Sequence, residues 1–110
     1  MMKRVLFAAL VFAAPAYPVL AQDAKISVDM IGIGSMSCAH WRSTQEHQLE
    51  GTVWIYGFWT GLNYVAAASD QIQAKIDVAA IANEVEKQCA HQMSQTLASA
   101  AWTAYLGSKR

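Results

Sequence analysis

The tripeptide Cys-Ala-His occurs at residues 38–40 and again at residues 89–91, and these two stretches contain the only cysteines of the chain. In an oxidising compartment a lone cysteine pair is normally joined as a disulfide. A bond between Cys38 and Cys89 would close a segment of 52 residues into a loop. On the chain-entropy model this would stabilise the fold by roughly 4 kcal/mol. We therefore expect one structural disulfide between them.

The same two tripeptides offer the four donors of a Cys2His2 metal site. Structural sites usually pair cysteines two to four residues apart, and export would oxidise the thiols before they met a metal. We therefore predict no metal and no other cofactor. If the disulfide holds His40 and His91 close together, the two imidazoles would repel when protonated, which makes them candidate pH-sensing residues. The simpler interpretation is that both are exposed residues at helix ends.

Residues 1–21 have the three parts of a secretory signal peptide. Lys3 and Arg4 precede an apolar run from residue 5 to residue 14, and Ala21 satisfies the small-residue rule for cleavage. The apolar run is too short to span a bilayer comfortably. We expect cleavage after Ala21 and a periplasmic location.

Loss of the leader would remove two basic residues and no acidic one. Six Lys and Arg would then face eight Asp and Glu, a net charge of −2 with His neutral. A mildly acidic chain without a basic stripe disfavours a nucleic-acid partner. The remaining chain is the size of one small domain, for which burial of apolar surface alone is marginal.

Helical patterns predict an all-α fold, a small four-helix domain over residues 37–106 cross-linked by the disulfide. The third helix has a stripe of apolar residues at positions i, i+3, i+7 and i+11, the last of which is Cys89. The fourth places small apolar residues and Tyr105 on one face and is expected to end at Gly107. The N-cap candidates are Ser37 for the first helix, Asp77 for the third and Ser94 for the fourth, and a second, longer helix is expected from about Thr44 to Ser69.

The segments on either side of this domain carry weaker signals. Residues 22–36 are expected to form an irregular arm, either a short edge strand or a flexible lead-in, because Gly32 and Gly34 would stop a regular element. Residues 107–110 are expected to be a solvated tail. No hairpin signal and no longer repeat is present.

The stretch between Glu50 and Asp70 has no charged residue, and Gly57 and Gly61 have the spacing of helix contacts in membranes. A transmembrane helix is therefore one interpretation. Threonines and an asparagine within the stretch are costly in lipid, so we favour a helix of a soluble domain and consider a membrane partner unlikely. Because its apolar residues occur all round, such a helix is expected to be buried or to pair with another chain.

The predicted long helix contains five of the eight aromatic residues that follow Ala21. Most of these rings must lie in the core, but a domain of this size has too little chain to cover them all. The exposed ones would lie at an interface with a partner protein, an unfolded client or a second copy in a homodimer. The candidate interface residues are Trp54, Phe58, Trp59 and Trp102.

The sequence lacks the motifs of common enzymes. There is no Gly-x-Ser-x-Gly, no His-Glu-x-x-His and no phosphate-binding loop. Ser43, His47 and Glu50 could be combined into a catalytic triad only on paper, since nothing in their spacing supports it. We therefore expect that the protein is not an enzyme.

The order of these elements resembles the HdeA/HdeB family of small periplasmic acid-stress chaperones. The family has a signal peptide, a cysteine that opens the first helix before an aromatic residue, a tryptophan-rich middle helix, and a third helix that begins at an Asp and ends at the second cysteine. The matching stretches of this sequence are residues 37–41, 52–58, 77–89 and 97–106.

The resemblance implies a chaperone that acts at low pH. Below about pH 4 the carboxylates would be protonated, and the basic groups would give the chain a charge of about +10. Repulsion of this size would loosen the helices and any dimer contact and expose aromatic surface to unfolding clients. The chain is also similar to exported immunity proteins of the Tai/Rap type, which neutralise type VI secretion effectors. A structural protein of the envelope without an acid role is the third alternative.

Overall fold

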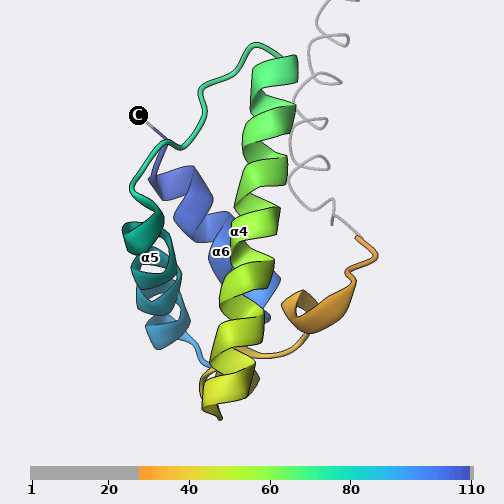
Figure 1. Cartoon of the computed structure of the whole chain (residues 1–110), viewed down its shortest axis with the longest axis vertical. Coiled ribbons are helices and arrows are strands. Elements are labelled where there is room, and N and C mark those ends of the chain that lie inside the picture. The colour runs from red at the N-terminus through yellow and green to blue at the C-terminus, as the bar shows by residue number, and fades with distance from the viewer. Residues whose placement is uncertain (1–27, 110) are drawn as a thin grey trace, which may run out of the picture.

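The computed structural model describes residues 28–109, and the expected leader and its cleavage site lie outside them. Within these residues the chain forms helices and no strand, so the all-α prediction is confirmed. Figure 1 shows α4 along the whole length of the domain, with α5 and α6 beside it and η1 near its lower half. The elements are η1 (Gly32–Ser35), α3 (Cys38–Arg42), α4 (Gln45–Ala68), α5 (Val78–His91) and α6 (Leu97–Gly107).

The first two α-helices begin where the sequence predicted, with Ser37 as the predicted N-cap of α3 and with α4 starting next to Thr44. The Ser37 hydroxyl accepts a hydrogen bond from the backbone N–H of His40, and Thr44 accepts one from His47, each at 3.0 Å. These bonds satisfy N–H groups that have no partner within the first turn of a helix. The sequence therefore located both helix starts.

Of the last two helices, α5 begins after the predicted residue and α6 does not. Asp77 occupies the N-cap position of α5, but its side chain makes no capping hydrogen bond. The cap of α6 is Thr96, which accepts a hydrogen bond from the backbone N–H of Ser99 at 3.1 Å, so the prediction of Ser94 was wrong. Ser94 lies in the preceding turn, where its hydroxyl accepts a hydrogen bond from the Gln92 side chain.

The expected irregular arm contains a folded segment. Residues 32–35 form the 3-10 helix η1, in which Ile33 and Gly34 are buried. A side chain at Gly34 would collide with the indole of Trp54, and Gly32 has a φ of +85°, which favours glycine. The glycines that predicted an end of regular structure therefore let this segment dock on α4.

The core lies where α4, α5 and α6 meet. The predicted α5 stripe is buried at Ile81, Val85 and Cys89, whereas Val78 at its start is exposed. The predicted face of α6 is buried too, and its alanines let that helix approach α5 closely. The buried residues of this face are Leu97, Ala98, Ala100, Ala101, Ala104 and Tyr105.

Helix α4 is buried on one side only. Its buried residues are Gly51, Ile55, Trp59 and Ala66, which share one face of the helix. A Cβ at Gly51 would collide with the buried Trp41 ring, so the close contact between α3 and α4 requires this glycine. Across residues 28–109, no helix combines the length and the apolarity needed to cross a membrane.

Candidate functional site

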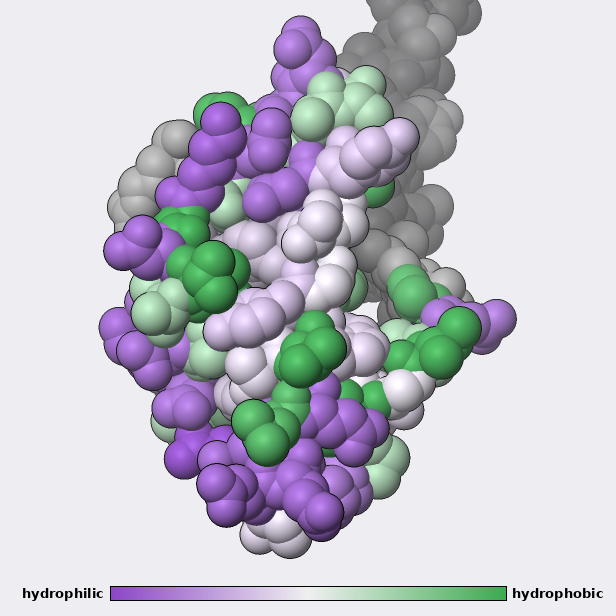
Figure 2. Space-filling model, in the orientation of Figure 1, coloured by the Kyte–Doolittle hydropathy of each residue, from purple (hydrophilic) through white to green (hydrophobic). Residues whose placement is uncertain are grey.

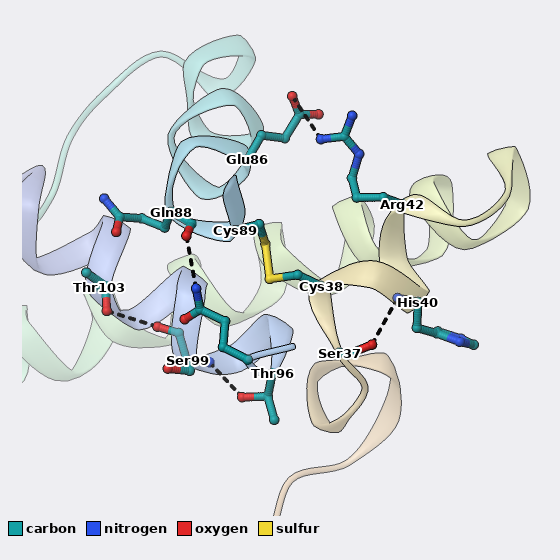
Figure 3. The surroundings of a disulfide bond; sticks show 11 residues. Ser37, Cys38, His40, Arg42, Glu86, Gln88, Cys89, Thr96, Ser99 and Thr103 are labelled. Carbon is teal, nitrogen blue, oxygen red and sulfur yellow. Dashed lines mark hydrogen bonds and ion pairs between the residues drawn. A yellow bond between two sulfur atoms is a disulfide. The ribbon is translucent and has the colours of Figure 1, made fainter. Parts of the chain in front are cut away.

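The disulfide joins the first residue of α3 to the last turn of α5. Cys38 and Cys89 are bonded as predicted, with their Cα atoms 5.6 Å apart and both residues fully buried. The surrounding backbone is tied as well, because the N–H of Cys38 donates to the carbonyl of Gln95 at 2.8 Å and that of Leu97 to Met36 at 2.8 Å. Figure 3 shows this junction, where the start of α6 lies beside the disulfide.

An exposed ion pair crosses the same junction. Arg42 of α3 lies 3.5 Å from the Glu86 carboxylate of α5 (Figure 3), and each side chain retains about 40% of its exposure. Such a surface pair contributes little at neutral pH, roughly 0–1 kcal/mol. It is the only ion pair among residues 28–109 that joins two helices, since Lys87 and Glu84 both belong to α5.

The candidate pH-sensing histidines do not form the predicted pair. His40 stacks on His47 instead, with ring centroids 4.1 Å apart. In Figure 3 the His40 side chain points away from the disulfide, because it lies two residues beyond Cys38 on a different face of α3. His91 is exposed in the last turn of α5. The histidine pair of this domain therefore lies at the turn between α3 and α4.

Ser43 and His47, two of the three residues considered above as a catalytic triad, are hydrogen-bonded to each other. The distance from Ser43 Oγ to His47 Nδ1 is 3.0 Å. The Ser43 hydroxyl also donates to the backbone carbonyl of His40 at 2.7 Å. Its single proton is used there, so Ser43 Oγ accepts from the His47 ring. In a serine nucleophile the hydroxyl would donate to the histidine. This contact therefore links α3 to α4 and does not prepare Ser43 for catalysis.

Two of the four candidate interface residues form a stacked pair on α4 beside η1. The rings of Trp54 and Phe58 are both half-buried, with centroids 4.9 Å apart. The Trp54 indole N–H donates to the carbonyl of Ile31 at 2.9 Å, just before η1. The pair is thus partly covered by a short segment rather than by the core.

The other two candidates lie in different surroundings. Trp59 is 2% exposed, meets Tyr105 edge to face at a centroid distance of 5.1 Å, and donates its indole N–H to the Ala74 carbonyl at 2.9 Å. Trp102 on α6 is 44% exposed. The structure therefore places Trp59 in the core and leaves Trp102 available to a partner.

Asn63 connects three parts of the fold through side-chain hydrogen bonds. From the sequence it was considered only as a polar residue that disfavours a transmembrane helix. Its side-chain oxygen accepts hydrogen bonds from the Ala74 N–H at 3.0 Å and from the Tyr105 hydroxyl at 2.7 Å. Its amide N–H donates to the Ala74 carbonyl at 3.4 Å. One side chain thus joins α4, α6 and the connection before α5. The only sign of this role in the sequence was a single asparagine within an uncharged helix.

Replacement of Asn63 by Leu is expected to lower the free energy of unfolding by about 2–4 kcal/mol, because the partly buried Ala74 N–H and Tyr105 hydroxyl would each lose a partner. Urea unfolding followed by tryptophan fluorescence measures this loss. The double variant Asn63→Leu, Tyr105→Phe should recover part of it, since it removes one of the stranded groups. Additive losses in the double variant would contradict the shared network.

A hollow of about 450 Å³ lies next to Asn63, between α4 and the chain that leads into α5. Its walls are mostly aromatic and aliphatic, with the Lys75 ammonium as the only charge. This lining suits an apolar side chain better than a charged small molecule. The lining residues are Tyr56, Trp59, Thr60, Asn63, Ala74, Lys75, Ile76, Val78 and Ile81.

An uncharged surface runs along the outward side of α4. Figure 2 shows white and green residues along this helix, bordered by purple residues over α5 and at the lower end. Val53, Tyr64 and Val65 are 70%, 76% and 61% exposed, and Gly57 and Gly61 lie between them. An uncharged helix face of this length is typical of an interaction surface.

The described residues hold no group of three or more His, Cys, Asp or Glu side chains that could bind a metal. Both sulfurs that the Cys2His2 alternative needed are in the disulfide. Comparison of the chain with protein-family models, with curated proteins and with solved structures found no match. The candidate sites are therefore the aromatic pair beside η1, Trp102 and the outward face of α4.

Proposed function

We propose that this protein is a periplasmic acid-stress chaperone-like protein that exposes aromatic surface at low pH and binds unfolding client proteins. The proposal rests on the resemblance to the HdeA/HdeB family over residues 37–106 and on one structural observation. The segments that cover the tryptophans of α4 lie outside the loop that the disulfide closes.

The disulfide encloses α3, α4 and α5, whereas η1 precedes Cys38 and α6 follows Cys89. Trp54 is covered by η1, and Trp59 is covered by Tyr105 of α6. Both covers are held to α4 by non-covalent contacts alone. They can separate from α4 while the disulfide keeps the other three helices together.

The segment η1 and the helix α6 differ in how strongly they are bound to α4. Release of η1 would expose the buried Ile33 and break the Trp54–Ile31 hydrogen bond, a cost of roughly 1.5–3 kcal/mol for the side chain and about 1 kcal/mol for the bond. Release of α6 would expose a whole helix face and costs much more. We therefore expect acid to uncover Trp54 and Phe58 first and Trp59 only after further loosening.

Acid acts on this structure through its overall charge. Protonation of the carboxylates leaves a large positive charge whose repulsion favours expansion. This repulsion weakens the folded state as the pH falls.

The test is a pH titration of the oxidised protein, followed by binding of a hydrophobic dye and by light scattering of an acid-denatured client. We expect dye binding and a soluble client between about pH 4 and pH 2, the range in which carboxylates are protonated. Trp54→Ala should bind less client, whereas Ile72→Ala, which removes an exposed apolar side chain from the connection between α4 and α5, should behave like the wild type.

A protein that keeps its native fluorescence at low pH and lets the client aggregate would refute the proposal. The exported immunity protein, which binds an effector at neutral pH, and the structural envelope protein would then be the functions to examine. Binding of one defined protein at pH 7 with high affinity would separate the first of these from the second.

A further inference from the structure

The stacked histidines at the turn between α3 and α4 bring two good metal ligands together. His40 belongs to α3 and His47 to the first turn of α4, and their ring centroids are 4.1 Å apart. Both residues are half-buried, so their rings are held by the fold and remain open to solvent. Neutral imidazole is the commonest metal ligand among protein side chains.

Ser43 determines which nitrogen of His47 is available to a ligand. The Ser43 hydroxyl donates its proton to the His40 carbonyl at 2.7 Å and therefore accepts a hydrogen bond from Nδ1 of His47 at 3.0 Å. The neutral His47 ring thus carries its proton on Nδ1 and has its lone pair on Nε2. Histidines that bind metals are oriented in this way, by a hydrogen bond from the nitrogen that does not bind the metal.

The two rings differ in how firmly they are oriented. Within residues 28–109 no hydrogen bond involves the His40 ring, whereas Ser43 holds the His47 ring. The lone pairs lie in the ring planes, so one ion cannot bind both rings while they stay stacked face to face. A rotation of the His40 side chain brings one of its nitrogens to Nε2 of His47, since two nitrogens bound to one ion at 2.0–2.1 Å lie roughly 3 Å apart.

We propose that His40 and His47 bind one Cu²⁺ ion, with His47 as the fixed ligand, His40 as the adjustable one, and water in the remaining positions. Imidazole suits Cu²⁺, Ni²⁺ and Zn²⁺, and of these three Cu²⁺ binds a given site most tightly. The site uses neither cysteine and so differs from the Cys2His2 alternative. With only two protein ligands it would bind the ion exchangeably. This inference does not rest on the proposed acid response.

The charges around the turn are compatible with a bound cation. The exposed Glu46 and Glu50 lie in the first two turns of α4, where they offset the positive end of the helix dipole. Arg42, which lies between the two histidines in sequence, pairs with Glu86 of α5 at 3.5 Å. Figure 3 shows the side chains of Arg42 and His40 leaving α3 in different directions. The guanidinium is therefore directed to α5 and not to the proposed site.

Isothermal titration calorimetry of the oxidised protein with Cu²⁺ at pH 7 tests the site. We expect one ion per chain with a micromolar dissociation constant, and affinity at least about tenfold lower in the double variant His40→Ala, His47→Ala. Ser43→Ala should weaken binding by about 10–100-fold, the range for loss of a partner that orients a metal ligand. The matched control is His91→Ala, which removes an exposed histidine of α5 and should bind like the wild type.

Electron paramagnetic resonance of the Cu²⁺ complex identifies the ligands. The wild type and His91→Ala should show coupling to two imidazole nitrogens, whereas His40→Ala or His47→Ala should show coupling to one. Far-ultraviolet circular dichroism at pH 7 checks that each variant is folded. A folded double variant that binds Cu²⁺ as tightly as the wild type, or an equal loss of affinity in His91→Ala, would overturn the proposal. Mg²⁺, which prefers oxygen ligands, should not compete with Cu²⁺, and competition would also overturn it.

Discussion

Reduction of the Cys38–Cys89 disulfide is expected to lower the free energy of unfolding by about 4 kcal/mol. The bond spans a sequence separation of 51, so its loss greatly increases the freedom of the unfolded chain. Small domains are stable by only about 5–15 kcal/mol, so at the lower end of this range the reduced protein would keep only about 1 kcal/mol of stability.

Urea unfolding of the oxidised and reduced proteins, followed by far-ultraviolet circular dichroism, measures this loss. The variant Cys38→Ala, Cys89→Ala should match the reduced wild type, because the effect comes from the bond and not from the reductant. An unchanged urea midpoint after reduction would mean that packing of α5 against α6 holds the fold without the bond.

Replacement of Trp59 by Ala is expected to cost about 3–5 kcal/mol, the range for removal of a large buried aromatic side chain. Its ring packs on Tyr105, and its indole N–H satisfies the Ala74 carbonyl. The same change at Trp102 should cost less than about 1 kcal/mol, since that ring is 44% exposed. Both tryptophans are candidate interface residues by sequence. This pair of variants distinguishes the tryptophan in the core from the one on the surface.

Thermal unfolding of both variants at pH 7 gives the comparison. A domain of this size loses roughly 4–8 °C in Tm for each kcal/mol, so the two variants should differ by at least about 8 °C. Similar Tm values for the two variants would place Trp59 outside the core. Client binding by Trp102→Ala at low pH then reports on the surface role of Trp102 without a large change in stability.

Local rules predicted the parts of the fold that depend on neighbours in sequence. The N-cap Ser37, the start of a helix next to Thr44 and the buried stripe that ends at Cys89 follow from hydrogen bonding and helical period. Thr96 was missed because Ser94 is an equally good cap by residue type. The choice between them depends on the backbone hydrogen bonds between residues 36–39 and 93–97, which join distant parts of the chain.

The candidate site was harder to predict because burial on α4 depends on where η1 and α6 dock. An all-round apolar helix gives no preferred face, so the sequence could not separate the buried Trp59 from the half-buried Trp54. The prediction that His40 and His91 lie close together was wrong for a related reason. A disulfide brings two backbones together, but the direction of His40 is set by its place on α3, and that direction leads to His47.

The long connection between α4 and α5 has one further consequence. Residues 69–72 are exposed, and exposed connections of this kind are preferred sites of proteolytic cleavage. Because the connection lies between the two cysteines, a nick there would leave both fragments covalently joined through Cys38 and Cys89. A protease that cuts the chain once within this connection would therefore release no fragment. The nicked molecule would keep α3, α4 and α5 in one covalent unit.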